Sequence, residues 1–442
     1  NDVDTAAELA DSIDDPFVCD QLLVAVAEKC AEIDDEEYAF QLAEAIEDSS
    51  FQGVALEQIA KQQAIKGNFE KALEIADDLE HGSNAYASIA NCQEKEAALK
   101  TIEKIEFPIT KVHALQEVAA ISNDTDILEK AAEIAKEIDF EEERIRAFLG
   151  ISFQYIEANR KDKAIQILDQ ARKYSETLDS VQKDSFLSQI SQGFMKSGSL
   201  DLADRTLDLV TDKYEIAHAL VGYADEFWAK NEEEEALDAL DEAYTILKSQ
   251  RDIETRNSKA KFNLLGLIAI RFASFGQLEK ALEIANENPY DEIRNNSLVQ
   301  ITVICEREVS SDLAKQAIRD INDDVERTFA MIALSDEKRK KEQKEEAMQN
   351  LEDAYHQTET VQQLSMKSLI FNRLADRFNL LGEKERSRAI CSDNLKTISD
   401  ILDQSHRVSV LAGLADTFES LDFELNDADK EILQTMVRKV AW

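Results

Sequence analysis

The sequence predicts an all-α protein built from stacked helical hairpins, and three repeated features support this prediction. First, a large apolar residue is followed at once by a small one at twelve places along the chain. Second, another series of small residues follows the first, typically twelve positions later. Third, glycine or asparagine recurs between the two series, where a helix can end. This recurrence at intervals of roughly 30 to 45 residues indicates a helical solenoid.

The small residues of the first series, here called the first ladder, are expected where two helices of a hairpin cross. Antiparallel helices pack about 8–10 Å apart, and a bulky side chain at the crossing would separate them. The first ladder comprises Ala27, Ala60, Ala90, Ala119, Ser152, Ser191, Ala224, Ala269, Thr302, Ser335, Ala375 and Ala415.

The second series, here called the second ladder, is expected to mark the partner helix of each hairpin. Its residues lie in short amphipathic runs, such as residues 71–76, whose apolar positions share one helical face. The second ladder includes Ala39, Ala72, Ala131, Ala164, Ala203, Ala236, Ala281, Ala314, Ala347 and Ser387. Five positions before a second-ladder residue, the expected helix stops are Gly67, Asn159, Gly198, Asn231, Gly276 and Gly382.

These patterns resemble the tetratricopeptide repeat, a helix–turn–helix unit of roughly 34 residues. The residues that fit this pattern best are Leu220, Tyr223, Ala224, Phe227, Ala236, Leu240 and Ala243, then Ile268, Ala269, Phe272, Ala281 and Ala285. The resemblance implies a right-handed α-α superhelix of about twelve helix pairs. The repeats are degenerate: the first helices lack the expected tryptophan, and several units are longer than the family's. A HEAT-type or another kind of α-solenoid is the alternative.

One continuous array over residues 1–442 is the predicted domain organisation. With only 3 prolines and 11 glycines, the chain has no stretch that is typical of a linker. Residues 1–13 have the pattern of a second helix without its partner, so they are either a capping helix or a sign that the chain continues upstream. Residues 426–442 are expected to form a C-terminal capping helix. Where units are longer, the extra residues fall between units and are expected to lengthen both flanking helices.

The formal net charge is −41, and the first 50 residues carry 16 acidic side chains but one basic residue, Lys29. Nucleic acids and anionic membranes are bound through positive charge, so neither is an expected partner. A protein or peptide with a basic surface is favoured. The sequence does not predict an oligomeric state.

One basic position recurs against this acidic background, eight residues before a first-ladder residue. We interpret it as a structural feature that ties adjacent hairpins together, with acidic residues such as Asp291 and Asp323 one turn earlier as partners. The position is occupied by Lys111, Arg144, Lys183, Lys261, Arg294, Arg327, Lys367 and Arg407.

Motifs of catalysis, nucleotide binding and metal binding are absent from the sequence. It has neither phosphate-binding glycine motif, no nucleophile elbow and no paired histidines of a zinc helix. The five cysteines have no C-x-x-C spacing, which suggests reduced thiols in a cytoplasmic protein. Acidic runs at helix starts are interpreted as caps. We therefore expect no catalytic residue, cofactor or metal.

The predicted function is a non-enzymatic scaffold that binds a protein or peptide partner on the solenoid surface. The alternative is a regulatory or substrate-recruiting arm of a larger enzyme whose catalytic domain lies outside this chain. The resemblance implies that the first helices line a concave binding face. The partner-binding candidates on them are Trp228, Asp225, His218, Arg146, Phe153 and Glu157. A tryptophan outside the core is a frequent interface anchor, although Trp228 could instead pack against the next unit.

Overall fold

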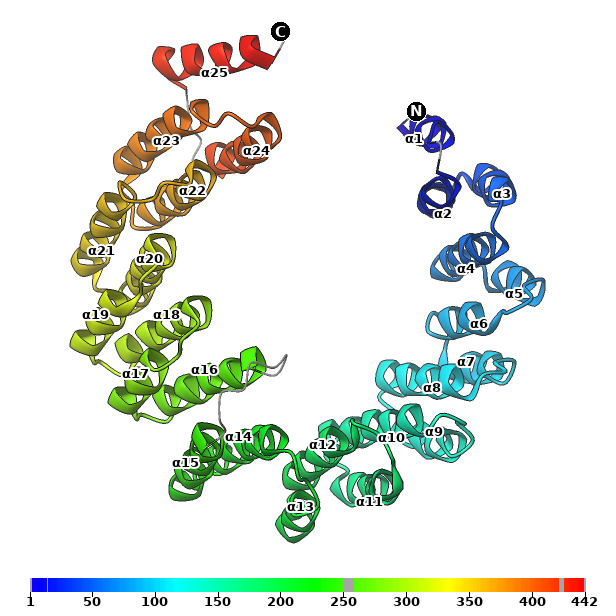
Figure 1. Cartoon of the computed structure of the whole chain (residues 1–442). Coiled ribbons are helices and arrows are strands. Elements are labelled where there is room, and N and C mark those ends of the chain that lie inside the picture. Colours follow the sequence, from blue (N-terminus) through cyan, green and yellow to red (C-terminus); the bar gives the residue numbers. More distant parts are fainter. Residues whose placement is uncertain (1, 14, 250–257, 421–424, 441–442) are drawn as a thin grey trace. The chain divides into compact units, whose positions relative to one another are not determined.

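The computed structural model describes residues 2–13, 15–249, 258–420 and 425–440. Every regular element in these ranges is an α-helix, from α1 to α25, and the same ranges contain no strand (Figure 1). The all-α prediction is therefore confirmed. Contacts between residues divide the chain into two compact units, Asn1–Ala219 and Leu220–Trp442. The boundary falls within α14 (Lys213–Ala229). The single continuous array over residues 1–442 stays a prediction.

Thirteen helices precede α14 in the first unit. They are α1 (Asp2–Asp11), α2 (Pro16–Glu32), α3 (Glu36–Ala45), α4 (Ser49–Ile65), α5 (Phe69–Asp77), α6 (Ser83–Ala90), α7 (Lys95–Ile102), α8 (Pro108–Ser122), α9 (Ile127–Ala135), α10 (Glu141–Glu157), α11 (Lys161–Thr177), α12 (Lys183–Lys196) and α13 (Leu200–Leu207).

Eleven helices follow α14 in the second unit. They are α15 (Glu233–Ser249), α16 (Ser258–Ser274), α17 (Leu278–Asn286), α18 (Asp291–Arg307), α19 (Ser311–Asp320), α20 (Asp324–Lys340), α21 (Lys344–Gln357), α22 (Leu364–Leu380), α23 (Lys384–Ser399), α24 (Gln404–Ser420) and α25 (Asp427–Val440).

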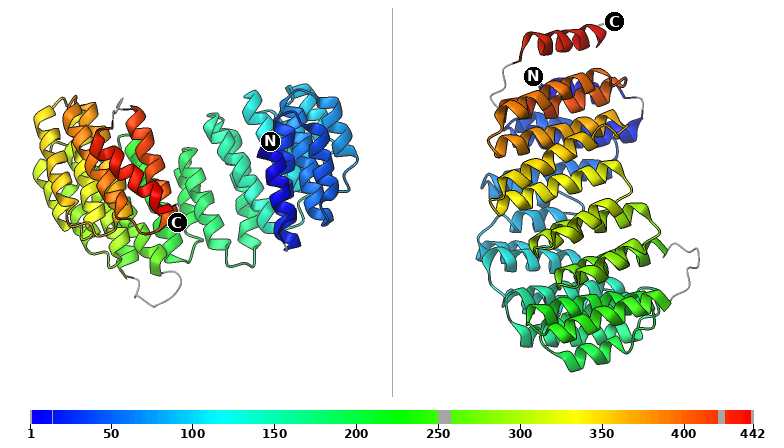
Figure 2. Two further views of the ribbon diagram at one scale, coloured as in Figure 1. Left: turned by 90° about the horizontal axis from the view of Figure 1, so that it is seen from above. Right: turned by 90° about the vertical axis from the view of Figure 1, so that its left-hand side faces the viewer.

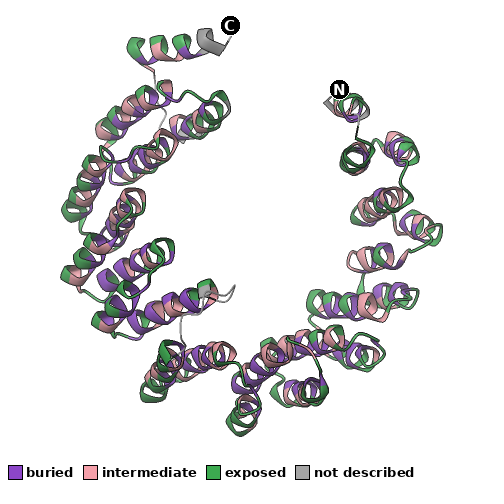
Figure 3. Cartoon of the chain, in the orientation of Figure 1, coloured by how far each residue is buried: buried purple, intermediate pink, exposed green. Residues whose placement is uncertain are grey.

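Most of the helices from α2 to α23 pack as consecutive pairs, with an even-numbered first helix and an odd-numbered second helix. In the first unit α2 contacts both its partner α3 and the next first helix, α4. In the second unit α22 contacts α23 and α24 in the same way. Neighbouring first helices therefore lie side by side within a unit (Figure 2). Buried residues lie between the helices, and exposed residues cover their outward faces (Figure 3).

The two ladders lie at the crossings of the paired helices, as predicted. Eleven of the twelve first-ladder residues and all ten second-ladder residues are buried. Three hydroxyl groups also join the ladders directly across a pair. Ser191 Oγ donates to the carbonyl of Ala203 at 2.9 Å, and Ser335 Oγ donates to that of Ala347 at 2.8 Å. Ser387 Oγ donates in the opposite direction, to the carbonyl of Ala375 at 2.7 Å.

Ala415 is the exception, because it is exposed on α24. The helix that follows it in the chain, α25, packs against α23, the second helix of the preceding pair. Ser392 Oγ on α23 donates to Asp429 of α25 at 3.1 Å, and Met436 of α25 is buried in the core of this region. The prediction that Ala415 marks a helix crossing is therefore wrong.

A left-handed residue ends nine first helices, five positions before the second-ladder residue. All six predicted stops have positive φ, between 56° and 84°. The chain makes the same turn at three residues that the sequence did not suggest: Asp34, Val309 and Glu342. At each such turn the next backbone N–H returns to a carbonyl in the last helical turn, as from Ser310 to Cys305 at 2.8 Å.

In several pairs the recurring basic residue joins the first helix to the connector before it. Arg144, Arg327 and Arg407 reach back six residues to the carbonyls of Ile138, Ile321 and Ile401, with Nε–O distances of 2.8, 3.1 and 2.8 Å. These carbonyls follow the end of a second helix, where acceptors lack a helical partner and a cation is favourable. The main partner is thus a backbone carbonyl, although Arg294 also pairs with Asp291.

The next residue of the same first helix joins the connector that follows. Asp184, next to Lys183, accepts hydrogen bonds from the backbone N–H groups of Thr211 and Asp212, at 2.9 and 2.7 Å. Asn295 Oδ1 accepts one from Asn322 N at 3.2 Å. Adjacent side chains at the start of a first helix therefore stabilise both neighbouring connectors.

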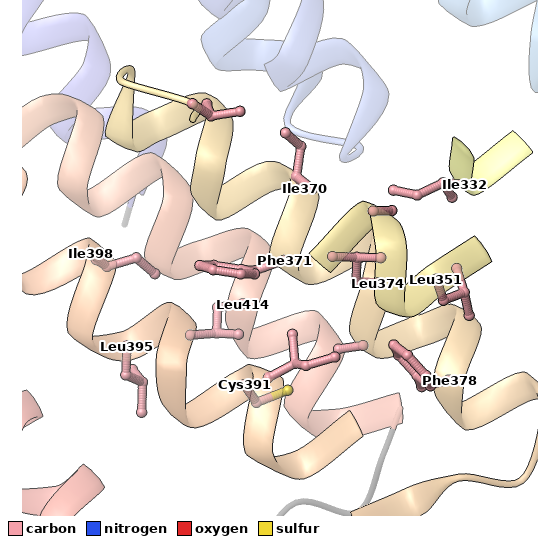
Figure 4. Close-up of a cluster of buried hydrophobic side chains, with 14 of the residues drawn as sticks. Ile332, Leu351, Ile370, Phe371, Leu374, Phe378, Cys391, Leu395, Ile398 and Leu414 are labelled. Carbon is pink, nitrogen blue, oxygen red and sulfur yellow. The ribbon is translucent and has the colours of Figure 1, made fainter. Parts of the chain in front are cut away.

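In the longer repeats, the extra residues that the structure describes lie in the second helices. The second helices α11, α15, α21 and α23 have 14 to 17 residues, whereas the others between α3 and α19 have 8 to 10. Most first helices, including α10 and α16, have 17 residues in long and short repeats alike. The expectation that both flanking helices lengthen is therefore wrong. The longer helices add buried residues such as Leu395 and Ile398 of α23 to the core (Figure 4).

Candidate functional site

Two of the predicted binding residues, Arg146 and Phe153, lie seven positions apart on α10 and both face α12. Arg146 Nη2 donates to Gln182 Oε1 at 2.6 Å, and its guanidinium lies 5.1 Å from the ring centroid of Phe186. The ammonium of Lys196 lies 6.0 Å from the ring centroid of Phe153. Arg146 is exposed and Phe153 is half-buried.

His218 contacts α12 from its other side. Its Nδ1 lies 3.3 Å from Gln192 Nε2, and its ring stacks on that of Tyr214 with centroids 6.2 Å apart. Burial raises the pKa of the neighbouring Glu215 carboxyl, and the charge of His218 opposes this rise. The surface of α12 therefore lies between Phe153 on one side and His218 on the other.

Glu157 lies at the end of α10 and lines a separate pocket of about 230 Å³. Small residues of α8, such as Ala119 and Ala120, form part of the wall, and Gln154 lies beside Glu157. The Gln154 amide donates to the carbonyl of Gln116 at 3.3 Å, whereas its Oε1 is buried without a hydrogen-bond partner among the described residues. Glu157 is thus close to a small polar pocket.

In the second unit, Asp225 and Trp228 both contact α16 or the residue that follows it. Asp225 accepts a hydrogen bond from Arg271 Nε at 2.6 Å. The indole of Trp228 stacks on Phe275, with ring centroids 4.2 Å apart and planes at 12°. Trp228 is half-buried, so one part of the ring packs on the next pair and another part meets solvent. Aromatic stacking of this kind orients the indole.

A second pocket, larger than the one beside Glu157, lies where α18, α20 and α22 begin, and we call it the acidic pocket. Its volume is about 490 Å³. The lining residues are Asp291, Glu292, Asn295, Asn322, Asp323, Val325, Glu326, Gln363 and Met366. Four carboxyl groups, three carboxamides and two apolar side chains therefore share one cavity.

The four carboxyl groups of the acidic pocket are not equally neutralised. Asp291 pairs with Arg294, and Glu292 pairs with Lys259 at 3.0 Å. Among the described residues, no cation forms an ion pair with Asp323 or Glu326. Burial and the neighbouring Asp323 raise the pKa of the Glu326 carboxyl, while the charge of Arg373 lowers it.

Sequence reasoning missed this pocket. Its acidic residues lie at helix starts, where a carboxylate is first interpreted as a cap, and Asp323 does accept a hydrogen bond from the backbone N–H of Glu326 at 2.9 Å. A usable signal was the recurrence of acidic residues near the starts of successive first helices, at Asp291 and Asp323, about one repeat apart. Such residues meet in space when first helices stack side by side.

The single basic run of the second unit, residues 338–344, is neutralised by its surroundings. Lys338 is buried and pairs with Glu306 at 3.0 Å and with Glu346 at 2.7 Å. Lys340 pairs with Glu337, which also pairs with Arg307. This run therefore offers no cationic patch to an anionic partner.

Three further properties of the described ranges bear on chemistry. No three histidine, cysteine or carboxyl side chains within them are grouped so that they could hold a metal ion. Burial raises the pKa of the Cys305 thiol to about 11 and that of Cys391 to about 12, so both are protonated at neutral pH. None of the described helices combines the length and the apolar character that crossing a bilayer requires.

Comparisons with known proteins find similarity to solved structures, and those given below have low sequence identity. No family model and no curated protein matches the chain. The crystal structure of Ton1535 from Thermococcus onnurineus NA1 is 16% identical, over 89% of this chain and 98% of that one, with a TM-score of 0.25. The apo form of the quorum sensor NprR from B. thuringiensis is 11% identical, over 87% and 97%, with a TM-score of 0.29.

A third similar chain comes from the APC/C hetero-tetramer Cut9–Hcn1, at 11% identity over 90% of this chain and 83% of that one, with a TM-score of 0.23. These scores carry no argument about function. The arrangement of the helices within each unit does define the fold: consecutive pairs cross at small residues, and neighbouring first helices contact each other. The chain has a TPR-like helical repeat architecture.

Proposed function

We propose that this chain is a non-enzymatic scaffold that binds a protein or peptide partner on the surface of its first helices. The proposal rests on one observation: the buried positions at the helix crossings keep small residues in every repeat, whereas the solvent-accessible positions beside them vary. The residue directly after each first-ladder residue, here called the surface position, is half-buried in ten of the eleven described cases and exposed in the other. At this position the chain places side chains as different as Glu28, Lys61, Phe153, Gln192, Ile270 and Asp336.

A surface that recognises one particular partner needs different side chains at equivalent positions of successive repeats. Buried positions are restricted by packing, since a change of one methylene group is felt in a close-packed core. The surface position has no such restriction, so its chemistry is free to match another molecule. Of the predicted residues, Phe153 and Asp225 occupy this position.

The other predicted residues add to the first-helix surface of their own compact unit. Arg146, Glu157, His218 and Trp228 lie on first helices and are exposed or half-buried. Trp228 supplies the anchor, because its stack on Phe275 fixes the ring before a partner arrives and lowers the entropy cost of binding. The excess of acidic residues in the chain favours a partner with a basic surface.

The test is photocrosslinking with benzoylphenylalanine placed at single positions. Positions 153 and 270 are surface positions on α10 and α16. Glu74 on α5 and Glu283 on α17 are exposed on second helices and serve as controls. We expect one and the same polypeptide to be crosslinked from position 153 or 270 and not from 74 or 283. Crosslinks from the second-helix positions alone would contradict the proposal.

A further inference from the structure

We propose that the acidic pocket binds a lysine or arginine side chain from an extended segment of the partner polypeptide, with the amide of Asn295 holding the main chain of that segment. This inference rests on the proposed function, because it assigns a class of ligand to one part of the first-helix surface. It is argued from the pocket's charge, from its shape and from one buried amide.

The charge of the pocket selects a cation. Its lining residues include four carboxyl groups and no basic side chain. Lys259 and Arg294 neutralise Glu292 and Asp291 from outside the lining, which leaves Asp323 and Glu326 without an ion-pair partner among the described residues. A bound cation would pair with these two carboxylates and offset their mutual repulsion.

The lining and the size favour an organic cation over a metal ion. In the described ranges, the carboxyl groups of the chain form no cluster of three arranged for a metal. The volume of 490 Å³ falls in the usual range of roughly 300–1,000 Å³ for sites that hold organic groups. Val325 and Met366 provide apolar surface in the same cavity. Lysine and arginine combine an aliphatic stem with a charged end, so they fit both kinds of wall.

Asn295 supplies a separate indication of a ligand. Its side chain lines the pocket and the residue is only 3% exposed. The oxygen of its amide accepts a hydrogen bond from Asn322 N, which fixes the orientation of the amide because a backbone N–H can only donate. The amide NH₂ group has no hydrogen-bond partner among the described residues. Unlike the fully buried, unpartnered atoms of the described residues, this NH₂ group keeps access to the pocket, and a peptide carbonyl of a basic segment is an acceptor that it can bind.

The experiment measures binding of the blocked peptide acetyl-Gly-Arg-Gly-Arg-Gly-amide by fluorescence anisotropy at 150 mM salt. The uncharged control, called the citrulline peptide, has citrulline in place of both arginines. The pocket variant is Asp323→Asn with Glu326→Gln. Asparagine caps a helix as well as aspartate does, so α20 keeps its start. The control variant, Glu234→Gln with Glu235→Gln, removes the same charge from exposed residues of α15.

The expected result is about tenfold weaker binding of the arginine peptide by the pocket variant, and less than about a twofold change in the control. The citrulline peptide should bind neither protein. Equal losses in the two variants would show a general attraction to an acidic protein and would overturn the proposal. So would the absence of binding to the unaltered protein.

A third variant, Asn295→Asp, separates the amide from the charge. It keeps an oxygen for Asn322 and removes the NH₂ donor, while it adds negative charge. We expect weaker binding of the arginine peptide, whereas stronger binding would contradict the role of Asn295. Crosslinking from position 153 or 270 together with no arginine-peptide binding would leave the scaffold function standing and refute only this inference.

Discussion

Adjacent positions on the first helices differ in how far packing restricts their side chains: one lies in the interior of the hairpin stack, and the next lies on its surface. Ala119 of α8 is buried at a helix crossing, and its neighbour Ala120 is exposed. Across the chain the first of these positions is always alanine, serine or threonine, whereas the second carries acids, bases, amides, aromatic and aliphatic residues. Packing restricts the first-ladder position to small residues. The surface position is free of this restriction, so it can carry the side chains that a function requires.

The sharpest test of this contrast introduces the same bulky residue at both neighbours. Ala119→Leu forces additional atoms between α8 and α9, and overpacking of this kind costs about 1–3 kcal/mol of unfolding free energy. Ala120→Leu adds the same atoms to an exposed site and should change the unfolding free energy by less than about 0.5 kcal/mol. Urea denaturation followed by circular dichroism checks both. Equal destabilisation would show that the ladder residue is not special.

A second test concerns the arginines that join four of the first helices to the preceding connector. Arg327→Met leaves the carbonyl of Ile321 without its charged donor, and we expect a loss of about 1–2 kcal/mol. Arg319→Met removes an exposed arginine from α19 and serves as the matched control, with little change expected. Unfolding midpoints that are lowered equally would contradict the structural role of Arg327.

The turn at Val309 offers a test in which stability should increase. Valine is strained at a φ of 61°, whereas Gly276 makes the equivalent turn with a φ of 78°. Val309→Gly should therefore stabilise the protein by about 1 kcal/mol, and Gly276→Val should destabilise it by a similar amount. A Cβ atom added at Gly276 would meet no atom within 4 Å, so the first carbon of the side chain adds no clash to the backbone strain. A loss of stability in Val309→Gly, measured by thermal unfolding, would refute this explanation.

The smallest expected effect is a dependence on pH. Hydrogen bonds from Arg307 and Lys340 hold the pKa of the Glu337 carboxyl below its usual 4.5. Because the folded-state pKa is the lower one, this carboxyl stabilises the fold above about pH 4.5 and loses that contribution as the pH falls through the folded-state value. Glu337→Gln should therefore reduce the loss of unfolding free energy as the pH falls below about 4.5, as measured by urea denaturation at a series of pH values. An unchanged curve would show that the pair contributes nothing measurable.

The sequence predicted those parts of the fold that depend on residue size or backbone freedom. Small residues at a fixed offset located the crossings, and glycine or asparagine located six of the turns. Asp34, Val309 and Glu342 escaped notice because tertiary packing imposes the left-handed turn on residues that do not favour it. Ala415 was misplaced because its environment depends on where α25 packs, which no local pattern records.

The candidate sites were less predictable for a related reason. Helical phase placed Arg146, Phe153 and Trp228 on first helices, yet their partners Gln182, Lys196 and Phe275 come from the next pair. The acidic pocket is assembled from three first helices, so each acidic residue alone resembles a cap. A feature formed only by stacking becomes visible only in three dimensions.

The most direct test of the account is a triple variant at surface positions, Lys61→Ala with Phe153→Ala and Gln192→Ala, studied by thermal unfolding and by photocrosslinking from position 270. We expect an unfolding midpoint within a few degrees of the original, since half-buried positions contribute little to the packing between helices. We also expect markedly less crosslinked partner. An unchanged yield of crosslinked partner, or a large fall in the unfolding midpoint, would contradict the claim that these positions serve recognition and do not stabilise the fold.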